Sequence, residues 1–182
     1  MINTEILDRA IIFAVKAHSG VERRGKDFPY IVHPLEAVAI ASTLTSDQEV
    51  LAAAALHDVV EDTPVQTSDL EREFGARVAS LVAMESDDLS KSWKERKQAA
   101  MDRIASEPRD AQIVALADKL SNMRAIARDY AVQGDALWNL FHETDRSLHE
   151  WHYRGLLAAF DALKGTFAHE EFEALINKVF SR

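Results

Sequence analysis

An apolar, alanine-rich run from Val50 to Leu56 leads directly into a cluster of titratable residues. The run predicts a buried helix, and a helix places residues four positions apart above one another. His57 would therefore lie beside Glu61, and the next column would hold Asp58 and Asp62. An imidazole beside a carboxylate suits a divalent metal ion, and the acidic pair could hold or deprotonate a water molecule. The alternative is a structural core histidine followed by an exposed acidic helix end.

The composition narrows the classes to which the chain can belong. Its 182 residues, 47% hydrophobic and 28% charged, fit a globular protein with a sizeable core. The formal charge of -9 disfavours nucleic acid and anionic membranes, so an anionic ligand would need a local basic cluster or a cation. The absence of cysteine leaves histidine and carboxylates as metal ligands. Since no segment reads as a secretion signal or a membrane span, we expect a cytoplasmic protein.

Apolar residues recur at helical spacing, and no stretch shows the alternation typical of a strand. We therefore expect an all-α protein in which residues 1–182 form a single helical domain. Pro34 is placed at the first helical position, which would make His33 the N-cap, and Ser68 begins a capping-box pattern. The expected helices cover about residues 4–18, 34–44, 47–62, 68–74, 93–108, 113–124, 138–141, 145–163 and 169–180, with another around Val78, Leu81 and Val82.

A loop between the first two expected helices carries Arg23, Arg24 and Lys26 within four residues. In an acidic protein these cations could clamp a phosphate, and arginine can also stack on a nucleobase. A solvated surface loop is the other interpretation. His33, which follows this loop, could reach the His57-Asp58 edge as a metal ligand, although a capping or surface role is simpler.

The stretch from Ile113 to Arg124 has apolar residues all around the expected helix, so this helix should be central and buried. A carboxylate in that position needs a partner, because uncompensated burial of a charge costs several kcal/mol. We expect Asp118 to meet a metal ion or a cation, with a salt bridge to a neighbouring arginine as the structural alternative. Asn122 lies one turn on and could direct its amide at the same place.

Other polar residues carry weaker signals. Lys97 belongs to a charged helix that is either a solvated face or a second basic wall near the site. Tyr153 or Arg154 could line a ligand cleft. His18 is interpreted as structural or supporting. The remaining histidines lack paired carboxylates at metal-binding spacing and are interpreted as surface or packing residues: His142, His149, His152 and His169.

Taken in chain order, His33, His57-Asp58 and Asp118 resemble the ligand pattern of the HD-domain metal-dependent phosphohydrolases. The resemblance extends over nearly the whole chain to the hydrolase domain of RelA/SpoT-type proteins and the small alarmone hydrolases. The segments that carry it are His18-Ser19-Gly20, Arg23-Arg24, residues 29–34, residues 56–63, Phe74-Gly75, Asp87-Asp88, Glu95-Arg96-Lys97 and residues 117–124. It implies an all-α HD-domain bundle with the metal site between central helices.

The resemblance also implies roles for individual residues. One cation per chain, usually Mn²⁺ with other divalent cations possible, would be held by His33, His57, Asp58 and Asp118. Glu61 and Asp62 match the pair that orients or deprotonates the attacking water. The substrate-binding positions match Arg23 and Arg24 around the guanine base, Asn122 and Tyr153 near the nucleoside, and Lys97 near the phosphates.

The activity implied is removal of the 3′-pyrophosphate from guanosine 3′,5′-bis(diphosphate), ppGpp, or from pppGpp. With no room for a synthetase domain, the chain is expected only to degrade alarmones, and the formation of a homo-oligomer is left open. Val21, a loop one residue longer before Pro29, and Leu89 depart from the family pattern. These departures keep open ppApp or a phosphorylated dinucleotide such as NADPH as the substrate. A catalytically weak nucleotide sensor that binds a partner is a third hypothesis.

Overall fold

The computed structural model describes residues 3–23, 27–83 and 91–181. Within these ranges the chain is helical, and the one extended pairing is an isolated bridge between Glu22 and Pro29. The prediction of an all-α fold is confirmed. The helices are α1 (Glu5–Ala17), α2 (Val32–Ala41), α3 (Gln48–Leu56), α4 (Val59–Asp62), α5 (Thr67–Phe74), α6 (Ala76–Ala83), α7 (Trp93–Ser106), α8 (Arg109–Gln133), α9 (Arg146–Ala159) and α10 (Phe167–Phe180), with 3-10 helices η1 (Gly134–Leu140) and η2 (Asp161–Leu163).

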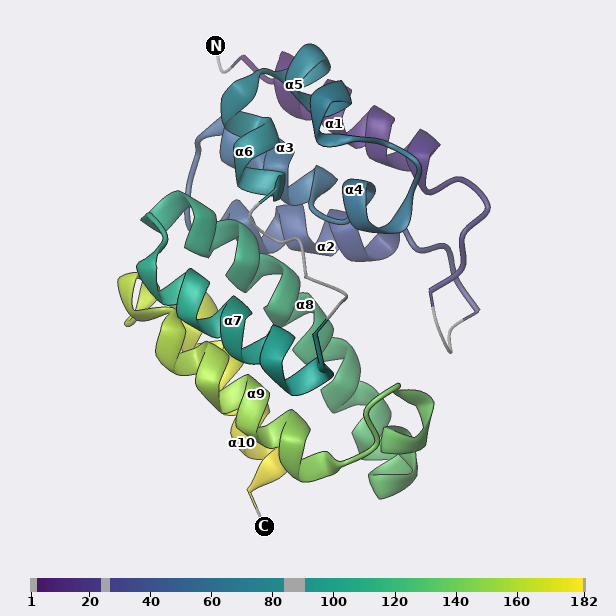
Figure 1. The fold of residues 1–182 in the computed structure, drawn as a ribbon, viewed down its shortest axis with the longest axis vertical. Coiled ribbons are helices and arrows are strands. Elements are labelled where there is room, and N and C mark those ends of the chain that lie inside the picture. Colours follow the sequence, from purple (N-terminus) through teal and green to yellow (C-terminus); the bar gives the residue numbers. More distant parts are fainter. Residues whose placement is uncertain (1–2, 24–26, 84–90, 182) are drawn as a thin grey trace.

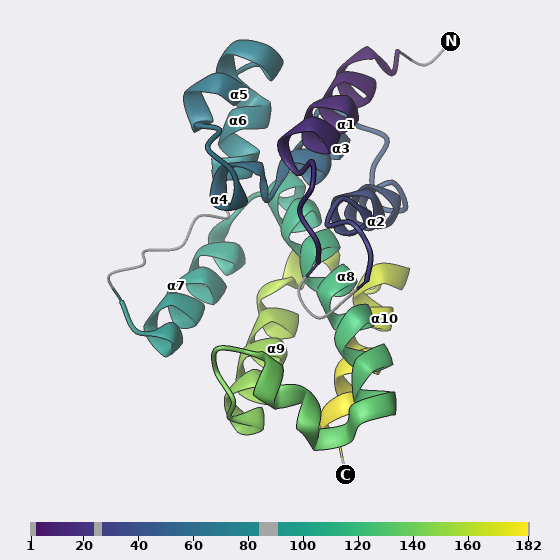
Figure 2. The same ribbon diagram turned by 90° about the vertical axis from the view of Figure 1, so that its right-hand side faces the viewer.

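Helix α8 joins two groups of helices. Figure 1 shows α1 to α6 gathered at one end of the molecule and α7, α9 and α10 at the other, with α8 running from one group into the other. The same division is visible after the quarter turn of Figure 2. Helix α8 packs against α2, α3 and α10, so residues on its different faces contact both groups. Among the described residues, none of the helices combines the length and the hydrophobicity that a membrane span requires.

Helix α3 is buried on all sides. Every residue from Val50 to Leu56 is buried, and α1, α2, α6 and α8 all pack against this helix. The four alanines in the run present only methyl groups, so neighbouring helices can approach closely. The Asp47 carboxylate starts the helix by accepting the backbone N–H of Glu49 at 2.9 Å, as a capping residue should. The C-terminal end of α3 is therefore fixed at the centre of the first group.

Helix α8 is the second buried helix that the sequence predicts. Each residue from Ile113 to Asp118 is buried, as are Leu120, Ser121 and Met123. The predicted burial on most sides is confirmed. Asp118 thus lies inside the protein, 5% exposed, on a helix that contacts both α2 and α3.

The predicted continuous helix from Asp47 to Asp62 is wrong at one point. Helix α3 ends at Leu56, His57 and Asp58 form a turn, and α4 begins at Val59. The His57 Nδ1 atom lies 2.9 Å from the Ala54 carbonyl oxygen. Because a side chain bonded to this carbonyl competes with the helical backbone, the interaction gives a physical reason for the break. The turn separates the His57-Asp58 pair from the acidic pair on α4.

Several other expected boundaries also differ. Helix α2 begins at Val32, so His33 lies in its first turn and is not the N-cap. Helix α5 is capped by Gln66, whose backbone N–H donates to Asp69 at 3.0 Å, two residues before the expected Ser68. Helix α9 ends at Ala159 and gives way to η2. Gly75, with a φ of 89°, ends α5 where the sequence predicts it.

Gly155 lets α9 pack closely against α7. A Cβ at this position would clash with the sulfur of Met101, the flexible end of a side chain that would have to move. These two helices carry one wall of the cleft described below, so their separation matters for the site.

We predict that Gly155→Ala is less favourable for stability in wild type than in a Met101→Ala background, because in wild type the added methyl must displace the flexible end of the Met101 side chain. In the Met101→Ala background that contact is gone, and alanine is preferred over glycine in a helix by about 0.5–1 kcal/mol. Urea unfolding of wild type, both single variants and the double variant measures this cycle. Equal effects of Gly155→Ala in the two backgrounds would contradict the prediction.

Candidate metal centre and adjoining cavities

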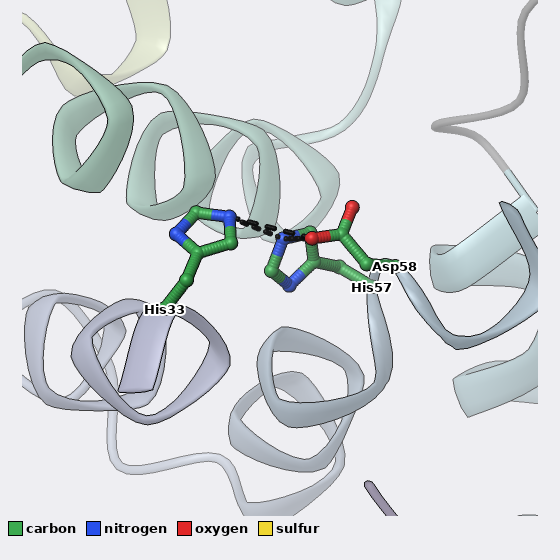
Figure 3. Close-up of side chains that lie close together, drawn as sticks. All are labelled: His33, His57 and Asp58. Atoms are coloured by element: carbon green, nitrogen blue, oxygen red, sulfur yellow. Dashed lines mark hydrogen bonds and ion pairs between the residues drawn. The ribbon is translucent and has the colours of Figure 1, made fainter. Parts of the chain in front are cut away.

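Side chains from two separate segments meet at the C-terminal end of α3. His33 comes from the first turn of α2, and His57 and Asp58 come from the turn between α3 and α4. Figure 3 shows the His33 ring directed at the other two side chains. One ligand atom from each of the three residues lies within 4.8 Å of the other two, an arrangement that could hold a metal ion.

The contacts within this cluster converge on the two imidazole Nε2 atoms, which lie 3.2 Å apart. The Asp58 Oδ2 atom is 2.8 Å from Nε2 of His57 and 3.3 Å from Nε2 of His33. From α8, Asp118 directs Oδ1 to within 3.0 Å of His33 Nε2 and 3.5 Å of His57 Nε2. The structure therefore brings together all four side chains that the sequence nominates as metal ligands.

Burial and charge both act on the cluster. Burial disfavours the charged imidazolium of His57, but the Asp58 and Asp118 carboxylates outweigh it and raise the pKa of His57 well above its ordinary value. Burial opposes ionisation of Asp58, but the neighbouring His57 and His33 lower the pKa of Asp58. The pKa of Asp118 is also lowered, because Lys119 and the two histidines outweigh its burial. The two carboxylates are thus held ionised and need positive charge close by.

The donor set fits a divalent metal ion. Two imidazoles and two carboxylates form a mixed nitrogen and oxygen environment that first-row divalent ions accept. The Nδ1 atoms of both rings are engaged elsewhere, His57 with the Ala54 carbonyl at 2.9 Å and His33 with the Ser121 hydroxyl at 2.8 Å. Both Nε2 atoms are therefore the ones left to face the carboxylates.

Tyr30 is a member of the site to which sequence reasoning gave no role. Its hydroxyl donates to Asp58 Oδ2 at 2.6 Å, and burial together with the Asp58 charge raises the pKa of Tyr30. Asp62 contributes to the same shift, which places its carboxylate near the hydroxyl. In the sequence, the position of Tyr30 next to Pro29 and shortly before His33 could have drawn attention to it. The spacing of these residues does not show that the Tyr30 side chain turns toward Asp58.

Asp118 has the partners that its burial requires. Asn122, one turn further along α8, donates from Nδ2 to Asp118 Oδ1 at 2.5 Å, so the predicted shared face is confirmed. Lys119 forms an ion pair with the other carboxylate oxygen. The structural alternative, a salt bridge from Asp118 to arginine, is not present among the described residues.

A cleft of about 270 Å³ opens beside the cluster. Glu61 and Lys97, two of the predicted site residues, line it, whereas Asp62 lies exposed on α4 outside its lining. The wall opposite the cluster comes from α7 and α9. The lining residues are Tyr30, His33, Asp58, Glu61, Trp93, Lys97, Ala100, Arg103, Ile104, Asp118, Lys119, Asn122, Phe141, His149, His152 and Tyr153.

A second cavity, also of about 270 Å³, adjoins the first. Its lining includes the apolar side chains of Ile126, Leu137 and Leu140. Four residues line both cavities: Tyr30, Asn122, Phe141 and Tyr153. The second cavity is therefore less polar and continues from the first.

Arg23 lies at the edge of the second cavity. Its guanidinium donates to the Asn122 amide oxygen at 2.6 Å and lies 5.7 Å from the centre of the Tyr30 ring. The nucleoside-binding candidates Arg23, Asn122 and Tyr153 are thus brought together. Arg24, the other candidate, lies outside the described residues, as do the Asp87-Asp88 pair and Leu89.

Comparison with known proteins gives the family. Residues 10–142 match the HD domain family. The chain belongs to the HD-domain family. It is 36% identical over 129 residues to guanosine-3′,5′-bis(diphosphate) 3′-pyrophosphohydrolase MESH1 of Danio rerio, covering 69% of this chain and 72% of that protein.

Two other relatives extend the comparison of this HD domain. It is 36% identical over 126 residues to the bifunctional (p)ppGpp synthase/hydrolase SpoT of Escherichia coli K12, a match that covers 66% of this chain and only 18% of SpoT. A solved structure of a metazoan ortholog of SpoT that hydrolyses ppGpp superposes with a TM-score of 0.78 at 24% identity, covering 98% of this chain and 97% of the other. This last likeness establishes the fold.

The remaining histidines of the chain are mostly buried. His142 is exposed, whereas His149, His152 and His169 are buried, so the interpretation of these four histidines as surface or packing residues is confirmed. His18 is also buried and packs 4.8 Å from the Tyr30 ring. His152 lines the first cleft, and its Nδ1 atom is buried with no hydrogen-bond partner among the described residues. Burial, with Lys97 and Lys119 nearby, lowers the pKa of His152.

We predict that divalent cation binding to the HD domain weakens as pH falls. Metal ligands must be deprotonated, and the carboxylates raise the pKa of His57, so an incoming ion has to displace a proton from this ring. Titration calorimetry in buffers of different ionisation enthalpy, between about pH 6 and pH 8, counts the protons released. Binding that releases no proton and has the same Kd across this range would contradict the prediction.

Proposed function

We propose that this HD domain hydrolyses guanosine 3′,5′-bis(diphosphate), releasing its 3′-pyrophosphate with the help of a bound divalent ion. The observation that carries the proposal is the convergence of His33, His57, Asp58 and Asp118 beside a cleft that continues into a less polar cavity. An anionic phosphate chain needs positive charge at its reacting end, and a nucleoside needs an apolar enclosure. The two cavities offer these environments side by side.

Under this proposal, His33, His57, Asp58 and Asp118 hold the ion. A bound divalent ion would neutralise phosphate charge and make a neighbouring water molecule more acidic. We propose Mn²⁺ as the resident ion, since the family resemblance points to it, although mixed nitrogen and oxygen sites accept several first-row ions.

The acidic pair on α4 is assigned to the attacking water. Glu61 lines the same cleft as His33, Asp58 and Asp118, and Asp62 lies near the Tyr30 hydroxyl. A carboxylate in this position can take the proton as the water oxygen attacks the 3′ phosphorus. The phosphorus to 3′-oxygen bond breaks, the 3′-oxygen leaves with a proton, and the products are GDP and pyrophosphate. No covalent intermediate with the protein is needed.

Cations that line the cleft are assigned to the phosphates. Lys97 and Arg103 project from α7 and Lys119 from α8, and all three line the cleft. Because the protein has a formal charge of -9, we assign the attraction of a polyphosphate to these three local cations. Lys119 also pairs with Asp118, so it contacts both the proposed metal site and the cleft.

The second cavity is assigned to the guanosine. The Arg23 guanidinium above the Tyr30 ring is a planar cation of the kind that stacks on a base, and Tyr153 and Asn122 extend toward the first cleft. Arg24 is proposed to lie against the base from the resemblance alone. A panel of nucleotides with different bases tests this assignment.

We predict that the purified protein loaded with Mn²⁺ releases pyrophosphate from ppGpp faster than it acts on ppApp or NADPH. The measurement is product release, followed by ion-exchange chromatography, with Mn²⁺ and again after chelation. Activity should disappear after chelation and return with the ion. A higher kcat/KM for ppApp or NADPH would overturn the guanosine assignment, and no turnover of any nucleotide would overturn the hydrolase assignment.

We predict that Glu61→Gln and Asp62→Asn each lower kcat by about 100-fold or more, because positioned proton transfer contributes roughly 10²–10⁴-fold to rate. Their Kd for Mn²⁺ should stay within about threefold of wild type, since neither residue is assigned to the ion. Glu173→Gln, on the exposed face of α10, is the matched control and should leave both quantities unchanged. Full kcat in both test variants would contradict the assignment.

A further inference from the structure

The His33 ring has a second partner on the side away from the cluster. Its Nδ1 atom lies 2.8 Å from the Ser121 hydroxyl oxygen, and the two residues are 3% and 1% exposed. The Ser121 hydroxyl in turn donates to Oε2 of Glu36 at 2.8 Å. His33 and Glu36 are one turn apart on α2, and Ser121 faces them from α8. The three groups form a chain of hydrogen bonds from a carboxylate, through a hydroxyl, to an imidazole.

The direction of these bonds determines which nitrogen of His33 carries the proton. A serine hydroxyl has one hydrogen, and this hydrogen is used on the Glu36 carboxylate. The Ser121 oxygen can then only accept from His33, so Nδ1 must be the protonated nitrogen. The lone pair of the neutral ring is therefore on Nε2, which is the atom that faces Asp58 and Asp118.

The outer end of this chain is anchored by an arginine. Arg124 donates from Nη1 to Oε1 of Glu36 at 3.2 Å and forms a two-pronged pair with Glu171 of α10, with both bonds at 2.7 Å. The Glu36 carboxylate thus has one oxygen on Arg124 and the other on Ser121. Since these contacts restrict its rotation, Glu36 is held where it can keep the Ser121 hydroxyl oriented.

His57 has a simpler support on the other side of the cluster. Its Nδ1 atom bonds to the Ala54 carbonyl, a neutral backbone acceptor in the same segment. His33 differs, because the hydrogen-bond chain behind it ends at a charged carboxylate and connects α2 with α8. A carboxylate behind a metal-ligating histidine fixes the ring orientation and increases the electron donation of the ligating nitrogen.

We propose that Glu36 and Ser121 are positioning residues for the metal site, which hold His33 with Nδ1 protonated and Nε2 directed at the ion. The inference rests on the proposed function for the metal site and adds two residues to it. A purely structural role would be to tie α2 to α8. The two roles can be separated, because Ser121 can be removed while the ion pairs of Arg124 with Glu36 and Glu171 remain.

The experiment measures the Kd for Mn²⁺ by titration calorimetry in wild type, Ser121→Ala, Glu36→Gln and Glu171→Gln. Loss of a partner behind a ligand typically costs 10–100-fold in metal affinity, so we expect a loss of this size in Ser121→Ala and a smaller one in Glu36→Gln. Glu171→Gln removes an Arg124 pair but leaves the hydrogen-bond chain, and its Kd should stay within about twofold. Urea unfolding in the presence of chelator checks that stability does not explain the difference.

A second measurement determines directly which nitrogen of the His33 ring carries the proton. Long-range ¹H–¹⁵N spectra of the Zn²⁺-loaded protein should show His33 protonated at Nδ1 in wild type and in Glu171→Gln. In Ser121→Ala we expect Zn²⁺ to be held less tightly and the proton at Nδ1 to exchange faster with water. Unchanged Kd and exchange in folded Ser121→Ala overturn the proposal, and if that variant does not fold, an unchanged Kd in folded Glu36→Gln overturns it.

These outcomes are separate from those of the proposed function. If wild type binds Mn²⁺ and hydrolyses ppGpp and Ser121→Ala does both equally well, the positioning role is refuted and the proposed function is retained. If wild type binds neither Mn²⁺ nor Zn²⁺, both the positioning role and the metal-dependent function are refuted.

Discussion

The arrangement of the candidate metal centre depends on one electrostatic constraint, the burial of the Asp118 carboxylate within the apolar part of helix α8. An ionised carboxylate without compensation would be costly there, and the protein supplies two imidazoles, an amide and an ammonium group around it. To reach Asp118 these groups must come from α2, from the end of α3 and from α8 itself. The packing of α2 and α3 against α8 is thus also the packing that builds the site.

Much of the fold and of the candidate site could be predicted from the sequence, because these features follow from local patterns. The apolar run from Val50 to Leu56 predicts a buried helix, and the encircling apolar residues of α8 predict a buried Asp118. The family follows from an ordered set of residues spread over the chain, which is far more specific than the His57-Asp58 pair. The one-turn spacing of Asn122 from Asp118 also fixes a contact that the structure contains.

What could not be predicted depends on contacts between distant segments. The break at His57 arises where an imidazole takes a backbone carbonyl, and helical spacing alone predicts an uninterrupted helix. Tyr30 reaches Asp58 from a loop, and Ser121 reaches Glu36 across 85 positions of the chain. Neither residue stands out by type or spacing. Side chains that support a site are polar residues in otherwise ordinary helices, so only their three-dimensional partners identify them.

The Asn122 amide has a consequence for how the two cavities respond to ligands. Its nitrogen contacts the Asp118 carboxylate while its oxygen accepts from Arg23, which lines the second cavity. A base that draws Arg23 away would free one end of this amide and alter its hold on the other. Thermodynamic linkage makes such an effect reciprocal, so a base in the second cavity and an ion at the cluster would change each other's affinity by the same factor. A single side chain would thus make nucleotide and ion uptake cooperative events.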